Sequence, residues 1–378
     1  MIVGERIKKL EKHGGKCMKK SISAVLAIAL VVVMGLSACS KPDTAQNPAE
    51  PKVVEVKELS GAGATFPAPL YQKYFDVYNQ EKGVQVNYQG IGSGGGIKNL
   101  IEKTVDFGGT DAPMSLEELE KAGSTVLHIP ACLGAVVLSY NLPGNPKLNF
   151  DAETISSIFL GSIRRWNDPA LVSLNPGVSL PDQEILTVFR SDGSGTTYTF
   201  TDYLNKASKV WAERMGVGKS LDWPVGIGSK GNDGVAGSIK TTPNSLGYVE
   251  MIYAYQNDLP YANIKNKSGN LIEPSLEAVS LAADIDLPDD LIVSITDTDA
   301  PQGYPIATFS WLIAYREQND GIRTLAQAQS TANMLWWVIT EGQQYNETLQ
   351  YGKLSSTTIE KAKALIKSMN FDDKKLIK

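Results

Sequence analysis

The hydrophobic pattern of this chain changes its period repeatedly from about residue 56 onward. Leu70, Tyr74 and Tyr78 recur at the spacing of one helical face, whereas residues 84–88 alternate between apolar and polar as a strand does. Strands are also predicted at 126–129, 135–140, 186–189 and 304–315, and helices at 97–105, 116–122, 152–160, 233–240, 322–341 and 358–369, with a further helix after Ser194. Such alternation is typical of an α/β fold in which helices flank a mostly parallel sheet.

The length of the chain indicates more than one folding unit. Its 378 residues exceed an ordinary single domain, and a hydrophobic content of 42% is enough to build a core. We therefore expect two lobes.

The N-terminal residues have the pattern of a bacterial export signal. Basic residues at 18–20 precede an almost unbroken apolar run at 22–34, and the sequence LSAC follows at 36–39. This ending resembles the lipobox of bacterial lipoproteins, which predicts that residues 1–38 are removed and that Cys39 is acylated. Met18 suggests that residues 1–17 are an over-extended gene start. A plain secretory signal and an uncleaved anchor are the alternatives.

Residues 39–55 are polar and rich in proline, without a helical or strand period, and we expect them to be a flexible tether. Removing residues 1–38 takes Lys+Arg from 36 to 29 and Asp+Glu from 41 to 39, so the net charge falls to 29 − 39 = −10. Such an acidic body repels nucleic acid, which is therefore not an expected partner. If this body binds an anion, the local geometry of the site must hold the anion against the net negative charge of the body.

The body of the chain is poor in residues that metal sites and nucleophilic enzymes use. After residue 39, Cys132 is the one remaining cysteine and His128 the one remaining histidine. An internal disulfide is thus excluded there, and Cys132 is expected to be a small buried hydrophobic residue. With no partner for His128, neither a His-based metal site nor a Ser-His-Asp triad is expected. We predict no metal and no cofactor.

Three glycine-rich loops precede predicted helices. They read GAGATFP at 61–67, GIGSGGG at 90–96 and RSDGSGTT at 190–197. The N-terminus of a helix presents free backbone N–H groups and a partial positive charge, and glycine lets an oxyanion approach the backbone closely. Each loop is therefore a candidate anion half-site, and Arg190 adds a cation to the third.

Other interpretations of these loops are less consistent with their surroundings. The second loop matches a dinucleotide fingerprint, and Asp111 lies at a suitable distance downstream. That aspartate, however, lies in a loop punctuated by glycine and proline rather than at the end of a hydrophobic strand. No P-loop lysine follows the glycines, and neither Ser93 nor Ser194 fits a nucleophile elbow.

Five ordered segments resemble the phosphate-binding proteins of Pst-type phosphate ABC importers. They read GAGATFPAP at 61–69, NYQGIGSGGG at 87–96, VDFGGTDAP at 105–113, RSDGSGT at 190–196 and GSKGNDG at 228–234. The resemblance implies a two-lobed periplasmic-binding-protein fold of type II, with phosphate in the cleft between lobes. It places lobe I at 56–133 and 306–378, and lobe II at 134–305.

Carried over by position, the resemblance implies a set of phosphate contacts. These are Thr65 and Phe66 through their backbone N–H groups, Ser93, Asp111, Arg190, Ser194, Gly195 and Thr196. Asp192 would hold Arg190 rather than the ligand. Gly94 departs from the pattern of other members, in which a second serine often follows the first. No contact is assigned to 228–234, for which a structural turn is the favoured interpretation.

The chemistry of these residue types agrees with that set. A guanidinium such as that of Arg190 can grip two phosphate oxygens at once. A carboxylate beside an anion is unexpected, but Asp111 can accept the proton that phosphate still carries at neutral pH. Sulfate lacks this proton and would face Asp111 with lone pairs alone, so Asp111 is predicted to select phosphate. A solvated turn residue is the alternative role for Asp111.

The sequence thus predicts a monomeric, lipid-anchored extracytoplasmic protein that captures inorganic phosphate and delivers it to the transmembrane permease subunits of an ABC importer. Closure of the lobes would create the surface that the importer recognises. The alternatives are an exported phosphatase or phosphoryl-transfer enzyme, a binding protein for another oxyanion, and a sensory module that meets no transporter.

Overall fold

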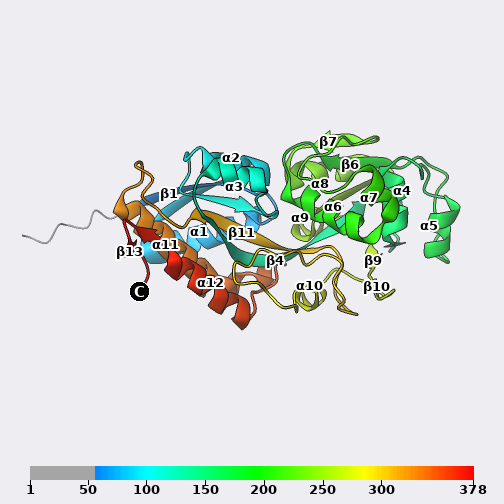
Figure 1. Ribbon diagram of the computed structural model, residues 1–378. Helices are drawn as coiled ribbons and strands as arrows, with labels where there is room; N and C mark the ends of the chain where they lie inside the picture. Colours follow the sequence, from blue (N-terminus) through cyan, green and yellow to red (C-terminus); the bar gives the residue numbers. More distant parts are fainter. Residues whose placement is uncertain (1–55) are drawn as a thin grey trace, which may run out of the picture. The chain divides into compact units, whose positions relative to one another are not determined.

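A long central strand, β4 (Val126–Tyr140), organises the fold. The structure, a computed structural model, describes residues 56–378. Its main sheet has eight strands in the order β2-β1-β3-β11-β4-β8-β6-β7 (Figure 1). The other strands of this sheet are β1 (Glu58–Gly63), β2 (Gln85–Gly90), β3 (Phe107–Thr110), β6 (Leu186–Arg190), β7 (Ile227–Ser229), β8 (Ser245–Glu250) and β11 (Ala307–Tyr315).

Strand β4 changes partner along its length. Its residues 126–135 pair with β11, and residues 136–140 pair with β8, both antiparallel. Strands β2, β1 and β3 are parallel to one another, as are β8, β6 and β7. We call β2, β1, β3, β11 and residues 126–135 of β4 sheet half A, and residues 136–140 of β4 with β8, β6 and β7 sheet half B. The expected mostly parallel arrangement is therefore present in each half, with antiparallel strands at the centre.

The two strands predicted at 126–129 and 135–140 are a single strand, which corrects the sequence-based expectation. Pro130 lies inside it and has no N–H to donate to a ladder. A β-bulge accommodates this residue, because Cys132 opposes Ser310 whereas Pro130 opposes the next residue, Trp311, so that Ala131 is extra. Local sequence favours a break at proline, but pairing with β11 on one side keeps the strand continuous.

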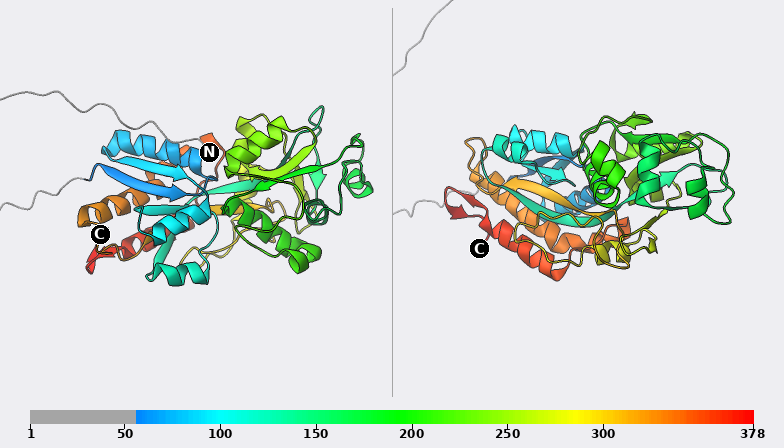
Figure 2. Two further views of the ribbon diagram at one scale, coloured as in Figure 1. Left: turned by 90° about the horizontal axis from the view of Figure 1, so that it is seen from above. Right: turned by 45° about the vertical axis from the view of Figure 1, so that its right-hand side comes forward.

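Helices cover both halves (Figures 1 and 2). Their bounds are α1 (Ala68–Lys82), α2 (Ser93–Ile101), α3 (Leu116–Ala122), α4 (Ala152–Phe159), α5 (Pro169–Leu174), α6 (Gly195–Ala207), α7 (Lys209–Arg214), α8 (Gly231–Thr241), α9 (Met251–Gln256), α10 (Leu276–Ala282), α11 (Leu325–Ile339) and α12 (Ser356–Ser368). Strand β1 and helix α1 lie beside α11 and α12, from the other end of the described chain (Figures 1 and 2). The helix predicted at 116–122 is present as α3 and begins with a capping box, in which Ser115 Oγ accepts from Glu118 N and Glu118 accepts from Ser115 N.

Short elements complete the described chain. They are β5 (Asn149–Phe150), β9 (Asn263–Lys265), β10 (Leu271–Ile272), β12 (Asn370–Phe371), β13 (Lys374–Lys375) and the 3₁₀ helices η1 (Glu341–Tyr345) and η2 (Glu347–Leu349). Strands β10, β9 and β5 form a small sheet, and β12 pairs with β13.

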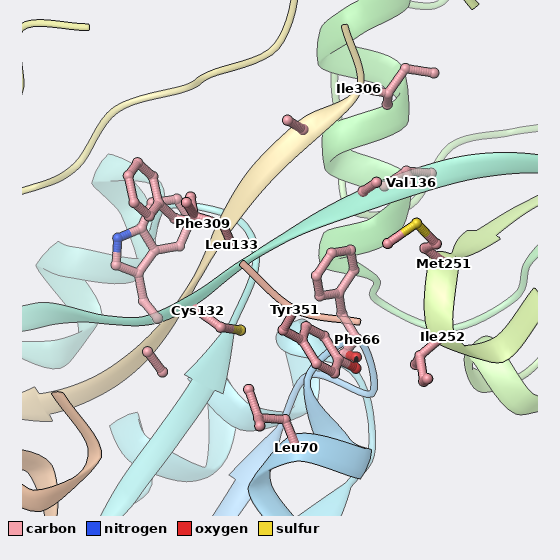
Figure 3. Close-up of a cluster of buried hydrophobic side chains, with 14 of the residues drawn as sticks. Phe66, Leu70, Cys132, Leu133, Val136, Met251, Ile252, Ile306, Phe309 and Tyr351 are labelled. Atoms are coloured by element: carbon pink, nitrogen blue, oxygen red, sulfur yellow. Dashed lines mark hydrogen bonds between the residues drawn. The ribbon is translucent and has the colours of Figure 1, made fainter. Parts of the chain in front are cut away.

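Hydrophobic side chains fill the space where β4, α1 and the C-terminal segment meet. Figure 3 shows Cys132 among Phe66, Leu70 and Tyr351. Cys132 is fully buried and not disulfide-bonded, as expected. His128 is buried as well, and its Nε2 accepts from the backbone N–H of Met114 at 3.3 Å.

Several expectations fall outside residues 56–378. They are the export signal at 1–38, the acylation site Cys39 and the tether at 39–55. Within the described residues, no helix has the length and apolar character needed to cross a bilayer.

Candidate functional site

The predicted ligand residues lie where parallel strands end and helices begin. Thr65 follows β1, Asp111 follows β3, and Arg190 is the last residue of β6. Ser93 is the first residue of α2 and Gly195 the first of α6. Within each half, the carboxyl ends of the parallel strands meet at one edge. Strands β3 and β6 run in opposite directions, so the loops that follow the strands of half A can meet those of half B, although they are far apart in sequence.

A first hydrogen-bonded group joins sheet halves A and B through Ser93. Its Oγ accepts from Gly195 N at 3.1 Å and from Asp111 N at 3.2 Å. Asp111 Oδ1 in turn accepts from Ser310 Oγ at 2.7 Å. Sequence reasoning missed Ser310, which lies in β11 and gives no local signal of a polar role.

Glycine at position 195 is required by this close approach. A Cβ there would lie 2.5 Å from Ser93 Oγ and 2.7 Å from Asp111 Oδ2, closer than any side chain tolerates. The backbone of α6 can therefore reach the serine and the aspartate only because residue 195 has no side chain.

A second group surrounds Arg190. Its Nε and Nη2 donate to the two oxygens of Asp192 at 2.8 and 2.6 Å, and its Nη1 donates to Thr196 Oγ1 at 3.2 Å. Asp192 also accepts from Gly231 N at 3.1 Å. The guanidinium is thus fixed by a bidentate ion pair that leaves Nη1 beside the first turn of α6.

Asn232, in the first turn of α8, connects this group to the first loop. Its Nδ2 lies 3.0 Å from Thr65 Oγ1 and 3.1 Å from Thr196 Oγ1. Sequence analysis singled out residues 228–234 but favoured a structural turn without contacts. The structure shows instead that this motif contributes a fully buried amide to the cluster. The motif at 228–234 was the one sequence feature that could have pointed to Asn232. The sequence did not show which residues Asn232 contacts.

The two remaining predicted residues have other contacts. Ser194 Oγ caps α6 by accepting from Thr197 N at 3.0 Å. The side chain of Phe66 lies in the core, and its carbonyl accepts from Tyr351 Oη at 2.6 Å. Of the predicted set, Thr65, Ser93, Asp111, Arg190, Gly195 and Thr196 are brought together by their side chains or backbone N–H groups, while Ser194 and Phe66 are their neighbours in the chain.

Burial shapes the charges of the site. It raises the pKa of Asp111 from its usual range to about 7, although hydrogen bonds from Ser310 and Ser93 and the charge of Arg190 act in the opposite direction. Burial would also raise the pKa of Asp192, but hydrogen bonds from Arg190 and from Gly231 N hold it below the usual value. The site thus contains one ion pair and one carboxyl poised near neutrality.

The donor set at this location suits an oxyanion. Backbone N–H groups at the starts of α6 and α8, hydroxyl groups and one guanidinium lie together here. Of the two aspartates in the cluster, Asp192 is held in the ion pair with Arg190, and Asp111 has no such cationic partner among the described residues. Among residues 56–378 there is no cluster of three or more His, Cys, Asp or Glu side chains that could hold a metal ion.

Comparisons with known proteins show the family of the chain. A family model described as "PBP superfamily domain" matches residues 44–328. The chain is 39% identical over 315 residues to the phosphate-binding protein PstS of Pasteurella multocida, covering 82% of this chain and 90% of that protein. It is 38% identical over 318 residues to PstS of Haemophilus influenzae, covering 82% and 92%.

A solved structure shows the same fold. The periplasmic phosphate-binding protein PfluDING, solved with phosphate bound, superimposes with a TM-score of 0.66 at 20% identity, covering 81% of this chain and 93% of that one. The predicted fold class, two α/β lobes of the periplasmic-binding type, is confirmed.

Proposed function

The chain belongs to the PBP superfamily and, within it, to the PstS phosphate-binding proteins, and we propose that it captures inorganic phosphate outside the cytoplasm and delivers it to the transmembrane permease subunits of an ABC importer. Its relatives are named as phosphate-binding proteins, and their alignments cover more than four-fifths of this chain. The alternatives of an exported phosphatase and of another oxyanion receive no support from these relatives.

One observation carries the proposal: donors from both sheet halves meet at a single buried location. Ser93, in the helix that follows β2 of half A, bonds Gly195, in the helix that follows β6 of half B. Thr65, in the loop after β1 of half A, bonds Asn232, in the helix that follows β7 of half B. A tetrahedral oxyanion needs donors from several directions, and a location reached from two halves supplies them.

We assign the phosphate contacts to the residues expected from the sequence. They are Thr65, Phe66, Ser93, Asp111, Arg190, Ser194, Gly195 and Thr196, with Asp192 holding Arg190. Their support is the placement of the side chains and helix N-termini, together with the ion pair of Arg190 and Asp192 at 2.6 Å. A hydrogen bond to a charged group contributes about 1.5 to 3 kcal/mol, so a few of them reach the roughly 8 kcal/mol of a micromolar site.

The lobe boundaries remain a proposal: lobe I at 56–133 and 306–378, lobe II at 134–305. The change of partner along β4 between Ala135 and Val136 supports a hinge near these limits. Ligand that contacts both lobes would favour a closed form, and the permease would recognise that form.

Calorimetric titration of the purified protein with phosphate, sulfate and arsenate tests the function. We expect micromolar or tighter binding of phosphate and far weaker binding of sulfate. Absence of heat with phosphate, or equal affinity for sulfate, would contradict the proposal.

We propose further that the protein is not an enzyme. Its relatives are named as binding proteins, and His128, the one histidine among residues 56–378, is buried in the core, where its Nε2 accepts from the backbone N–H of Met114. Incubation with a phosphate ester should release no inorganic phosphate above the uncatalysed rate.

The lipid anchor is also a proposal, supported by the LSAC sequence at 36–39. We expect labelled fatty acid to be incorporated into the wild-type protein and not into Cys39→Ser, which should appear in the soluble fraction. The protein is proposed to act as a monomer, and analytical ultracentrifugation with and without phosphate tests this.

A further inference from the structure

Asn232 occupies a position between two hydroxyl groups of the proposed phosphate site. It is fully buried in the first turn of α8, and its amide spans from Thr65 in the first loop to Thr196 in the third. No role for it followed from the sequence.

The orientation of this amide is fixed by the backbone. Asn232 Oδ1 lies 3.0 Å from Glu250 N, and a backbone N–H requires an acceptor. The oxygen must therefore face Glu250, so that Nδ2 faces Thr65 Oγ1 and Thr196 Oγ1 with one hydrogen for each.

This orientation determines what the two hydroxyls can do. A hydroxyl can accept two hydrogen bonds and donate one. Thr65 Oγ1 accepts from Asn232 N at 3.2 Å and from Nδ2 at 3.0 Å. Thr196 Oγ1 accepts from Arg190 Nη1 at 3.2 Å and from Asn232 Nδ2 at 3.1 Å. Both acceptor positions of each threonine are occupied. The contact in which Thr196 Oγ1 donates, to Asn232 Oδ1, is long at 3.5 Å, so the capacity left to each hydroxyl is to donate.

Ser93 follows the same pattern without Asn232. Its Oγ accepts from Gly195 N and Asp111 N, and the contact in which it donates, to Asp111 Oδ2, is long at 3.4 Å. Three hydroxyls from three loops are therefore oriented to donate hydrogen bonds to an incoming acceptor.

We propose that Asn232 is a positioning residue that turns the Thr65 and Thr196 hydroxyls into obligatory donors toward the ligand. The inference rests on the proposed phosphate function and adds to it a reason for oxyanion preference. With its lone pairs already occupied, each threonine can bind a ligand oxygen that bears a lone pair, and it offers nothing to a ligand group that must donate. Asn232 itself need not touch phosphate.

Two variants test this role by calorimetry with inorganic phosphate on the otherwise unchanged protein. Asn232→Ala removes both side-chain donors. Asn232→Asp keeps the size and the acceptor for Glu250 N, but it presents a carboxylate oxygen to both hydroxyls, which would then donate to it and turn away from phosphate. We expect about a 10- to 100-fold loss of affinity for Asn232→Ala and a larger loss for Asn232→Asp.

A double-mutant cycle separates positioning from a general structural effect. In a Thr65→Val background one of the hydroxyls is absent. The fold-loss of phosphate affinity caused by Asn232→Ala should therefore be smaller there, by a factor of about three or more. Asn175→Ala is the matched control, since Asn175 is another buried asparagine that bonds backbone carbonyls away from the site. It should lower thermal stability and leave phosphate affinity unchanged.

The outcomes distinguish the two proposals. If the wild-type protein fails to bind phosphate, the proposed function is wrong. If the wild type binds and Asn232→Asp binds equally well, or the loss for Asn232→Ala is the same in both backgrounds, the function stands and the positioning role is wrong. Should Asn232→Ala not fold, the same cycle with Asn232→Asp decides.

Discussion

Lys219 Nζ lies 2.7 Å from Glu118 Oε2, and this ion pair joins α3, beside sheet half A, to the loop that follows α7, beside half B. The carbonyl of Lys219 also accepts from Ser194 N at 2.8 Å, so the same residue touches the third anion loop. The side chains are 18% and 22% exposed, which limits screening by solvent. The pair is thus placed to stabilise a closed arrangement of the halves.

Lys219→Met should therefore speed phosphate release and weaken binding by about 3- to 10-fold, with a smaller difference from wild type at high salt. Stopped-flow release and calorimetry at two ionic strengths measure this. The control is Lys121→Met, which removes the exposed pair with Glu117 on the same helix and should leave binding unchanged. Equal effects of the two substitutions would contradict a closing role for Lys219.

Arg190→Ala should abolish measurable phosphate binding, because it removes the site's guanidinium and leaves Asp192 without its bidentate partner. Calorimetry at millimolar phosphate is the measurement. Arg165→Ala removes a comparable arginine–aspartate pair on the surface, with Asp182, and should bind as the wild type does. Retained affinity in Arg190→Ala would show that the third loop is not the site.

Asp111→Asn should weaken phosphate binding more than sulfate binding, by about 10-fold in the ratio of affinities. An amide can donate to sulfate as well as accept, whereas the carboxylate can only accept the phosphate proton. Competition titrations with both anions give the ratio. An unchanged ratio would refute proton recognition by Asp111.

In the absence of phosphate, the buried carboxyl of Asp111 should make the stability of the protein depend on pH. Its folded-state pKa of about 7 lies above the ordinary 3.8, so the folded protein holds a proton that the unfolded chain has released. This contribution is full below pH 3.8 and is lost as the pH rises through about 7. The amide of Asp111→Asn does not ionise. When the pH is raised from 4.5 to 8, the free energy of unfolding of this variant relative to wild type should therefore increase by on the order of 2 to 4 kcal/mol.

Urea unfolding at both pH values measures that gain. The comparison between pH values cancels any pH-independent cost of the new amide. Asp182→Asn is the control, because its pKa is lowered by its hydrogen bond to Arg165 and its carboxylate is exposed. It should show no gain with rising pH, and a similar gain in both variants would rule out the burial of Asp111 as the cause.

Gly195→Ala should lower phosphate affinity by at least about 100-fold, because the new methyl group would lie 2.5 Å from Ser93 Oγ and force the two halves apart. Gly237→Ala in α8 is the control, since a Cβ there meets nothing within 4 Å. Small-angle scattering with phosphate should show a more open molecule for Gly195→Ala. Unchanged affinity would mean that Ser93 and Gly195 need not meet.

The sequence alone determined the local elements and the chemistry of the loops. Periodicity and caps act within a few residues, so the capping box of Ser115 and Glu118 and the glycine-rich starts of α1, α2 and α6 could be predicted. The residue types in those loops also indicated an oxyanion.

The tertiary structure alone decided which residues meet. Pairing with β11 keeps β4 a single strand through Pro130. The order of the strands brings Asn232 next to Thr65, which lies 167 residues away in the chain. Burial raises the pKa of Asp111 against the opposing hydrogen bond from Ser310, which lies 199 residues away in the chain. These relations require contacts between distant segments, whose energies depend on the whole packed chain and leave no pattern in the local sequence.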